Sequence, residues 1–292
     1  MTAQLNRNGR GILLMVLAIF LFTVMDATAK GLVRSYPTNQ VIWARFTGQF
    51  LIVLVILRLN WRVMLQTEHP VLHLFRSLSQ MGAAACFFAS LPYIGLAEAT
   101  AVTDLNPVLI TVGAALFLKE QIGPRRIFGV LVALVGGLIV IRPGLGVFTP
   151  AALLPLGAAI FYSATALLTR FLGKKESYWT AMLHTAFVGS LLSSMTLPVS
   201  FAPIQAGDLP LFVMIGIIGT LGQLCLIRSF SMAEASAVAP FAYLGLIFAT
   251  FWGITLYGEY PDRWTVIGAL VIVAAGLYVW HRETQGQRSS TE

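Results

Sequence analysis

The stretch AEATAV at residues 97–102 recurs as AEASAV at residues 233–238, 136 positions later. Further along, a glutamate and two glycines recur 139 positions later, since Glu120, Gly129 and Gly137 match Glu259, Gly268 and Gly276. Matches in the same order, with a three-residue insertion between them, indicate two copies of one unit. We place the first copy in residues 1–144 and the second in residues 145–282. The polar tail at residues 283–292 is predicted to be disordered.

The composition is that of a membrane protein. Hydrophobic residues make up 57% of the 292 and charged residues 11%, whereas a soluble domain has about 25% charged residues. The apolar residues form ten runs, each with roughly the 20 residues that a membrane helix needs. These runs are 11–33, 39–59, 73–96, 99–118, 123–141, 149–170, 178–197, 209–231, 235–257 and 263–281. The fold class is therefore predicted to be all-α, with ten transmembrane helices.

The number of apolar runs predicts how the two copies are oriented in the membrane. Each copy holds five, and an odd number of spans makes the second copy enter the membrane from the opposite side, as in many secondary transporters. Of the 19 Lys and Arg residues, Arg45 lies inside a span, fourteen lie on the N-terminal side, and four lie opposite: Lys30, Arg34, Arg142 and Arg263. Because positive charge favours the cytoplasmic side, both termini are predicted to be cytoplasmic.

Three ionisable residues fall inside the predicted spans at a similar depth. With a rise of about 1.5 Å per residue, Asp26, Arg45 and Asp104 lie about 6–7 Å from the middle of their spans, all toward the same side. A charge at that depth costs about 3 kcal/mol, so it normally faces a partner or a water-filled cavity. Asp26 is expected to meet Arg45 beside a cavity, either to serve the substrate or only to join two helices. Asp104 is then an excess acid for an ammonium group or a proton.

Prolines mark the fourth span of each copy. Pro107 and Pro240 each remove one backbone hydrogen bond and so predict a helix break. A carbonyl freed beside a cavity could bind a cation or an amine, although a simple kink is the alternative. Tyrosine hydroxyls inside a membrane also need partners. The candidate substrate-binding residues are therefore Asp26, Arg45, Tyr93, Asp104, Asn106, Tyr162 and Tyr243.

Motifs for other chemistry are missing. The chain has no GxxxxGK[ST] loop for ATP and neither an HExxH nor a GxSxG motif. His69 and His73 have the spacing of metal ligands on a helix, but they lie at the membrane interface with Pro70 between them. No catalytic residue, metal or cofactor is predicted. The basic residues lie between apolar runs, which argues against a nucleic-acid partner.

Small residues spaced by four favour close packing of the fifth and tenth spans. Gly129, Ala133 and Gly137 follow this pattern, which lets helices approach within one chain or between two chains. A monomer or a weak homodimer is expected.

A longer pattern carries a resemblance to a known family. The segment LNPVLITVGAALFLKEQIGPRRIFGVLVALVGGLIVI at 105–141 combines a proline, an acid at the helix end and a glycine-rich fifth span, and LYGEYPDRWTVIGALVIVAAGLYVW at 256–280 repeats its second part. With ten spans in two halves, the chain resembles the EamA family of the drug/metabolite transporter superfamily. The resemblance implies a metabolite carrier, often an exporter, whose central cavity is lined by spans 1, 3, 4, 6, 8 and 9.

Together these features predict a secondary transporter that moves a small organic metabolite across a bacterial inner membrane by alternating access. Amino acids, above all aromatic ones moved outward, are the leading substrates, because paired charges suit a zwitterion and aromatic residues suit a ring. The alternative is uptake of a larger metabolite such as S-adenosylmethionine or riboflavin. A membrane-embedded enzyme would need a nucleophile or a metal cluster, and none is visible. Proton coupling and facilitated diffusion both stay open.

Overall fold

The first half of the chain forms five membrane-length elements in a computed structural model that describes residues 2–118, 124–142, 150–172, 176–233 and 238–289. A short 3₁₀ turn (η1) and one short helix (α3) connect α2 to α4. The bounds are α1 Thr2–Val33, α2 Thr38–Leu57, η1 Arg58–Asn60, α3 Trp61–Leu65, α4 Pro70–Ser90, α5 Leu96–Thr103, α6 Asn106–Leu118 and α7 Pro124–Ile141. Helices α5 and α6 together make the fourth span.

The second half repeats this order. Its bounds are η2 Pro150–Leu153, α8 Leu154–Leu172, α9 Tyr178–Ser200, α10 Leu209–Met232, η4 Ala239–Tyr243, α12 Leu244–Tyr257 and α13 Arg263–Ser289. The predicted spans match these elements to within a few residues at most ends. One end differs, since residues 283–289 of the tail, expected to be disordered, continue α13 as helix. Glu, Gln and Arg are strong helix formers, so a helix already started by apolar residues propagates through them.

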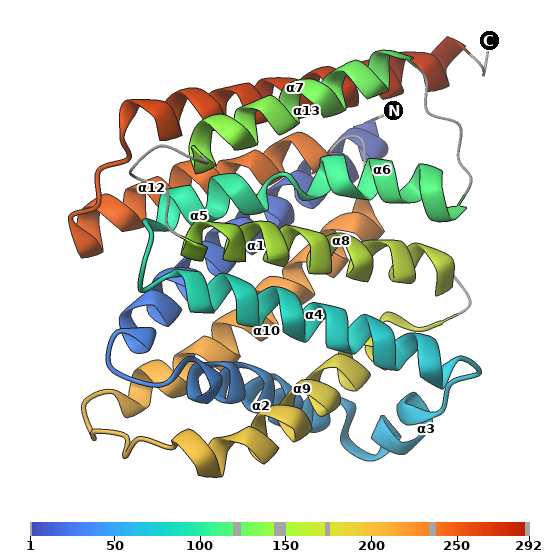
Figure 1. Cartoon of the computed structure of the whole chain (residues 1–292). Helices are drawn as coiled ribbons and strands as arrows, with labels where there is room; N and C mark the ends of the chain where they lie inside the picture. Colours follow the sequence, from blue (N-terminus) through green and yellow to red (C-terminus); the bar gives the residue numbers. More distant parts are fainter. Residues whose placement is uncertain (1, 119–123, 143–149, 173–175, 234–237, 290–292) are drawn as a thin grey trace.

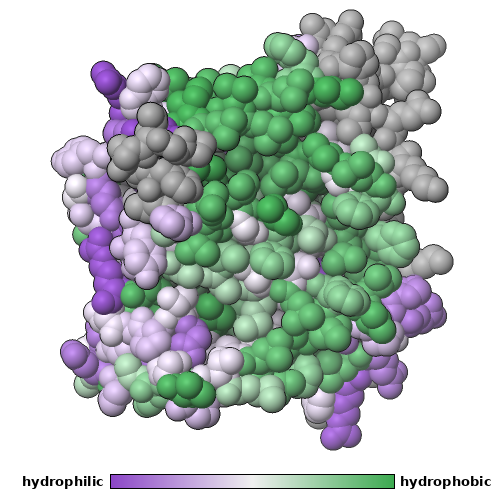
Figure 2. Space-filling view, in the orientation of Figure 1, coloured by the Kyte–Doolittle hydropathy of each residue, from purple (hydrophilic) through white to green (hydrophobic). Residues whose placement is uncertain are grey.

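Six of the described helices are long and apolar enough to cross a membrane, and three shorter apolar ones accompany them. The six are Gly9–Val33, Thr38–Leu57, Leu96–Phe117, Pro150–Thr169, Tyr178–Ser200 and Leu209–Met232. Helix α4 belongs to neither group, because His73, Arg76 and Gln80 lower its hydropathy. Figure 2 shows a broad apolar surface with hydrophilic residues gathered toward its margins, as a bilayer-embedded bundle requires.

Contacts between the halves come in matched pairs. Helix α1 packs on α10 as α4 packs on α8, and α2 packs on α10 as α4 packs on α9. Helices α2 and α9, and likewise α7 and α13, pack on their own counterparts. In each pair of contacts, both helices of one contact are replaced in the other by their equivalents from the opposite half. The bundle therefore consists of two inverted five-helix repeats, as predicted. Both termini lie at one end of the bundle (Figure 1); we call this the terminal end and the opposite one the far end.

Glycines allow the closest approaches between the halves. A Cβ on Gly48 of α2 would lie 2.8 Å from the Gly216 Cα on α10. On α13, a Cβ on Gly268 would lie 2.6 Å from the Gly136 carbonyl oxygen of α7. Helices α7 and α13 are the predicted fifth and tenth spans, and their contact lies within one chain. Backbone therefore rests on backbone at both crossings, the packing expected between membrane helices.

Candidate functional site

The fourth span of each half is irregular near its middle. Helix α5 ends at Thr103 and α6 begins at Asn106, with Asp104 capping the first segment through its N–H, which donates to the Thr100 carbonyl at 2.8 Å. The carbonyl that Pro107 leaves without a backbone partner is that of Thr103. It accepts from the Asn106 side-chain amide at 3.0 Å. This carbonyl is thus satisfied within the chain.

The second half has its irregular segment at the matching place. The 3₁₀ turn η4 spans Ala239–Tyr243 and gives way to α12 at Leu244. Tyr243 is the last residue of η4. Its hydroxyl packs against the backbone of α13, where a Cβ on Gly276 would collide with it. The two irregular segments thus bring Asp104 and Tyr243 into the same part of the bundle.

Asp104 is a half-buried acid with one buried oxygen that has no partner. Its Oδ2 atom is buried and accepts no hydrogen bond, and no cationic side chain in the described ranges lies within 4.0 Å of it. The phenol groups of Tyr162 and Tyr243 are close enough to interact with it electrostatically. Leaving a buried carboxylate oxygen without a partner is costly, so a donor or a cation beside this oxygen would be stabilising.

Asp26 and Arg45 act on one another through space but do not touch. Within the part of the chain that the structure describes, neither side chain forms a hydrogen bond, and their charged atoms do not come within the 4.0 Å of an ion pair. The guanidinium of Arg45 lies instead near the rings of Phe46 and Phe88, at 5.3 and 5.4 Å from their centroids. The direct contact expected from the sequence is therefore absent, and Arg45 contacts aromatic rings in its place. Both side chains are half-buried.

Tyr93 does not join this group. It lies in the turn between α4 and α5, largely exposed. There it lines a cavity of about 290 Å³ together with Lys30, Glu98, Glu259 and Tyr260. The sequence places Tyr93 inside the third span, but α4 ends at Ser90. The structure thus puts this tyrosine at the mouth of the far end.

A buried ion pair closes the far end. Lys30, only 1% exposed, places its Nζ 2.8 Å from Glu259 Oε1 and donates to the Ile94 carbonyl at 2.7 Å. Glu259 also accepts from the Leu96 N–H at 3.1 Å, and the Arg34 guanidinium lies 3.2 Å away. The lysine belongs to the first half and the glutamate to the second. The contact therefore joins α1, the α4–α5 turn and the end of α12.

A second set of contacts extends this closure. Arg142 at the end of α7 lies 2.6 Å from Asp262 Oδ2 and 3.9 Å from Glu98 Oε1. Thr265 of α13 donates through its hydroxyl to Glu98 at 3.1 Å and through its N–H to Asp262 at 2.8 Å. We call the six charged residues Lys30, Arg34, Glu98, Arg142, Glu259 and Asp262 the far-end network. It carries three positive and three negative charges, so it is neutral overall and crosses between the halves.

The far-end network should weaken in acid. Partial burial by itself would raise the pKa of Asp262, but hydrogen bonds from Thr265 and the charge of Arg142 outweigh it and hold that pKa below its ordinary value. A carboxyl group with a lowered pKa stabilises the fold above its unfolded pKa of about 3.9 and loses that effect as the pH falls through the folded pKa. Thermal unfolding of wild type and Asp262→Asn should therefore differ at pH 6 and converge below about pH 4. Equal unfolding temperatures at pH 6 would show that this contact contributes nothing.

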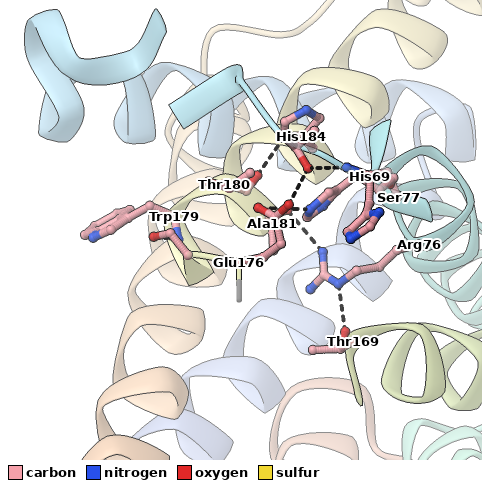
Figure 3. Close-up of polar contacts among 12 residues, drawn as sticks. His69, Arg76, Ser77, Thr169, Glu176, Trp179, Thr180, Ala181 and His184 are labelled. Carbon is pink, nitrogen blue, oxygen red and sulfur yellow. Dashed lines mark hydrogen bonds and ion pairs between the residues drawn. The ribbon is translucent and has the colours of Figure 1, made fainter. Parts of the chain in front are cut away.

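Arg76 forms a polar contact toward the terminal end that the sequence reasoning missed (Figure 3). Its Nε donates to Thr169 of α8 at 2.7 Å, and its Nη1 donates to the Ala181 carbonyl at 3.1 Å and to Thr185 of α9 at 2.8 Å. By its position in the sequence, Arg76 is one of the fourteen basic residues assigned to the N-terminal side. Its place three residues inside the predicted span 73–96 was the available signal that it faces the bundle.

A histidine cluster lies beside Arg76 (Figure 3). The His73 ring is fully buried, neither of its nitrogens forms a hydrogen bond, and its Nε2 lies 3.7 Å from Glu176 Oε2. It stacks on His184 with ring centroids 4.9 Å apart, and Glu176 also accepts from Thr67 at 2.5 Å. Within the described ranges, no three acidic, histidine or cysteine side chains are arranged to hold a metal ion.

Comparison with known proteins identifies the family. The model of the EamA-like transporter family matches residues 9–142 and again residues 149–280. The chain belongs to the EamA-like transporter family. The two matched segments coincide with the two halves that the contacts between helices define.

Curated EamA relatives cover nearly the whole chain. A pseudopaline exporter of Pseudomonas aeruginosa is 28% identical over 268 residues, which are 91% of this chain and 94% of that protein. A riboflavin transporter of Rhizobium johnstonii is 27% identical, covering 95% and 93%, and an S-adenosylmethionine uptake transporter of Rickettsia prowazekii is 24% identical, covering 97% and 96%. A protein of known crystal structure shares the fold, with a TM-score of 0.62 and 18% identity over 92% of this chain and 95% of that one. The chain is thus a multi-pass membrane protein of a family whose curated relatives carry small metabolites.

Proposed function

We propose that this EamA protein is a secondary transporter that carries a small organic metabolite with an ammonium group. The observation that carries this proposal is Asp104, whose Oδ2 atom is buried and unpaired at the helix break of the fourth span. A cationic ligand group would supply the missing partner, and the charge-assisted hydrogen bond would be strong in a site shielded from water. Amino acids supply such an ammonium group, and aromatic ones are the first choice because the phenols of Tyr162 and Tyr243 lie within electrostatic range of the carboxyl group.

The proposed mechanism is alternating access between the repeats. The far-end network joins the first half to the second through Lys30–Glu259 and Arg142–Asp262. Opening of that end breaks these pairs, and closure of the terminal end makes contacts in their place. Because the halves are inverted copies, one rocking motion exchanges the two closed ends. Neither a nucleotide nor a catalytic residue is needed, which favours a carrier over an enzyme.

A larger substrate is the second candidate, and the relatives support it about equally. Their names include carriers of riboflavin and S-adenosylmethionine as well as an exporter. S-adenosylmethionine also carries an ammonium group that could pair with Asp104. Direction therefore stays a proposal too, with export the first choice and uptake the alternative.

Transport by purified protein tests these proposals. Protein reconstituted in liposomes, preloaded with unlabelled compound and supplied with no nucleotide, should accumulate the labelled form by exchange. L-phenylalanine, S-adenosylmethionine and riboflavin are the three probes, with empty liposomes as the control. Exchange of at least one probe supports a carrier and selects the substrate class. Exchange of none, by protein that is folded and correctly inserted, would remove both substrate candidates.

We also propose that the terminal end faces the cytoplasm of a bacterial cell, so that the far end faces outward. This orientation rests on the distribution of basic residues, since four lie on the far side and fourteen on the terminal side. Alkaline phosphatase is active only outside the cytoplasm. Fused after Glu292 it should be inactive, and inserted between residues 142 and 150 it should be active. The opposite pattern would reverse the orientation.

A further inference from the structure

Two cavities adjoin at the far end of the bundle. The larger, of about 290 Å³, is bordered by the α4–α5 turn of the first half and by residues 259–261 of the second half. The smaller, of about 170 Å³, lies beside α5 and the end of α7. Tyr93, Ile94 and Glu98 line both cavities. We call the two cavities together the vestibule.

Two exposed tyrosines line the larger cavity, one from each half. Tyr93 is 69% exposed and Tyr260 is 78% exposed, so both rings lie at the outer rim. The face of such a ring attracts a cation. Among the described residues, the cations of this end that lie over a ring choose Tyr257 and Trp264. The rings of Tyr93 and Tyr260 are therefore open to a cation from outside the chain.

Glu98 is the acid of the vestibule that the chain compensates least. The two close ion pairs of the far-end network do not include it. Over the described ranges, the cation within 4.0 Å of Glu98 is Arg142, at 3.9 Å, which is too far for a hydrogen bond. Its hydrogen bonds come from neutral donors, the hydroxyl of Thr265 and the N–H of Gly95. A carboxylate that borders both cavities thus has room for a closer cation.

Helix α5 leads from the vestibule into the bundle. Glu98 and Val102 lie one turn apart on α5, about 6 Å along its axis, and both line the smaller cavity. Asp104 is the C-cap of the same helix, six positions and about 9 Å beyond Glu98 along the axis. The two carboxyl groups therefore follow one another along one helix, the first at the vestibule and the second deeper in the bundle.

We infer that the vestibule is a second binding site, which takes an organic ammonium ion. The ammonium group pairs with Glu98, and the organic part packs against the rings of Tyr93 and Tyr260. These groups come from both halves while Lys30 and Glu259 are paired, so the ligand is held with the far end closed. The inference rests on the proposed carriage of a metabolite with an ammonium group, for which the vestibule is the outermost stop.

Protection of one cysteine from a thiol reagent reports on this place alone. Pro92 is exposed and lines the larger cavity. Pro92→Cys, in a protein whose Cys86 and Cys225 are changed to serine, is labelled in detergent with the neutral reagent N-ethylmaleimide. The probe is the phenethylammonium ion, its neutral counterpart is 2-phenylethanol, and the ionic strength is held constant with NaCl. Ser35→Cys is the matched control, because Ser35 is exposed after α1 and lines neither cavity.

The expected pattern depends on both charge and ring. Phenethylammonium should slow the labelling of Pro92→Cys but not that of Ser35→Cys, and 2-phenylethanol should slow neither at the same concentrations. Glu98→Gln should raise the concentration for half-maximal protection at least about tenfold, because a hydrogen bond to a charged group is lost. Tyr93→Leu and Tyr260→Leu each remove a ring at an exposed site and should raise it about threefold.

The inference is overturned if 2-phenylethanol protects as well as the ammonium ion, or if folded Glu98→Gln protein keeps the original half-protection concentration. If Glu98→Gln does not fold, the two tyrosine variants decide, since they alter exposed side chains, and unchanged protection in both would be equally fatal. Protection lost in Asp104→Asn but kept in Glu98→Gln would place the ammonium group at Asp104 only. Intact protection without exchange of any probe in liposomes would instead contradict the transport function.

Discussion

Replacing Lys30 by methionine is expected to destabilise the protein by about 3 kcal/mol, near the lower limit for breaking a buried ion pair. The ammonium group is 1% exposed and is bonded to both Glu259 and the Ile94 carbonyl. Its removal leaves the partly buried Glu259 carboxylate with one positive charge fewer beside it. It also leaves the Ile94 carbonyl oxygen without its hydrogen-bond donor. The remaining bonds from Leu96 and Arg34 to Glu259 keep the loss from being larger. Thermal and denaturant unfolding in detergent measure it.

Arg34 provides the matched control, because it pairs with the same carboxylate oxygen. Its guanidinium is 48% exposed and lies 3.2 Å from Glu259. An exposed pair contributes about 0–1 kcal/mol, so Arg34→Gln should change stability little. The double variant Lys30→Met with Glu259→Gln removes both charges and should recover much of the loss. Equal effects of Lys30→Met and Arg34→Gln would mean that the burial of Lys30 contributes no stability.

Asp104→Asn should reduce transport more than tenfold while the protein stays folded. Asparagine keeps the size of the side chain and a hydrogen-bonding oxygen, but it removes the charge that pairs with an ammonium group. A hydrogen bond to a charged group contributes about 1.5–3 kcal/mol, which corresponds to roughly a 10- to 150-fold change in affinity. Since one carboxylate oxygen is buried without a partner, loss of the charge should not lower stability. Uptake rates over a range of substrate concentrations give the effect.

Glu68→Gln is the control for this substitution, because Glu68 is an exposed acid before α4. It should transport at the wild-type rate. Asp104→Asn protein with the normal affinity and the normal pH dependence would exclude Asp104 both as the ammonium site and as a proton site.

The sequence predicts the span pattern well because lipid imposes it. Apolar runs of fixed length and a repeated order of motifs locate α1, α2 and the other membrane elements to within a few residues at most ends. They also locate the broken fourth span, since Pro107 and Pro240 interrupt it. Depth along each helix follows from counting residues, which is why Asp26, Arg45 and Asp104 were recognised together.

The direction in which each side chain faces could not be read in this way. Asp26 and Arg45 share a depth, yet α10 packs on both of their helices and the charges do not touch. Lys30 lies near a predicted helix end, where a long side chain can usually reach water, but Glu259 from 229 positions later draws it inside the protein. Arg76 is grouped with the loop charges because a count of basic residues on each side of the membrane takes no account of the helix face on which a residue lies. Such contacts depend on long-range packing, to which local patterns are blind.

Locking the far end shut tests the central claim that the two repeats open it during transport. Glu98 of the first half and Thr265 of the second, bonded at 3.1 Å, are replaced by cysteines in a protein whose Cys86 and Cys225 are changed to serine. A short, reducible thiol crosslinker then joins them, and cysteines at Asp262 and Thr265, both in the second half, serve as the control pair. The account predicts that crosslinking the first pair slows exchange in liposomes at least about tenfold, that reduction restores it, and that the control pair has no effect. Exchange at an unchanged rate with the first pair fully crosslinked would contradict it.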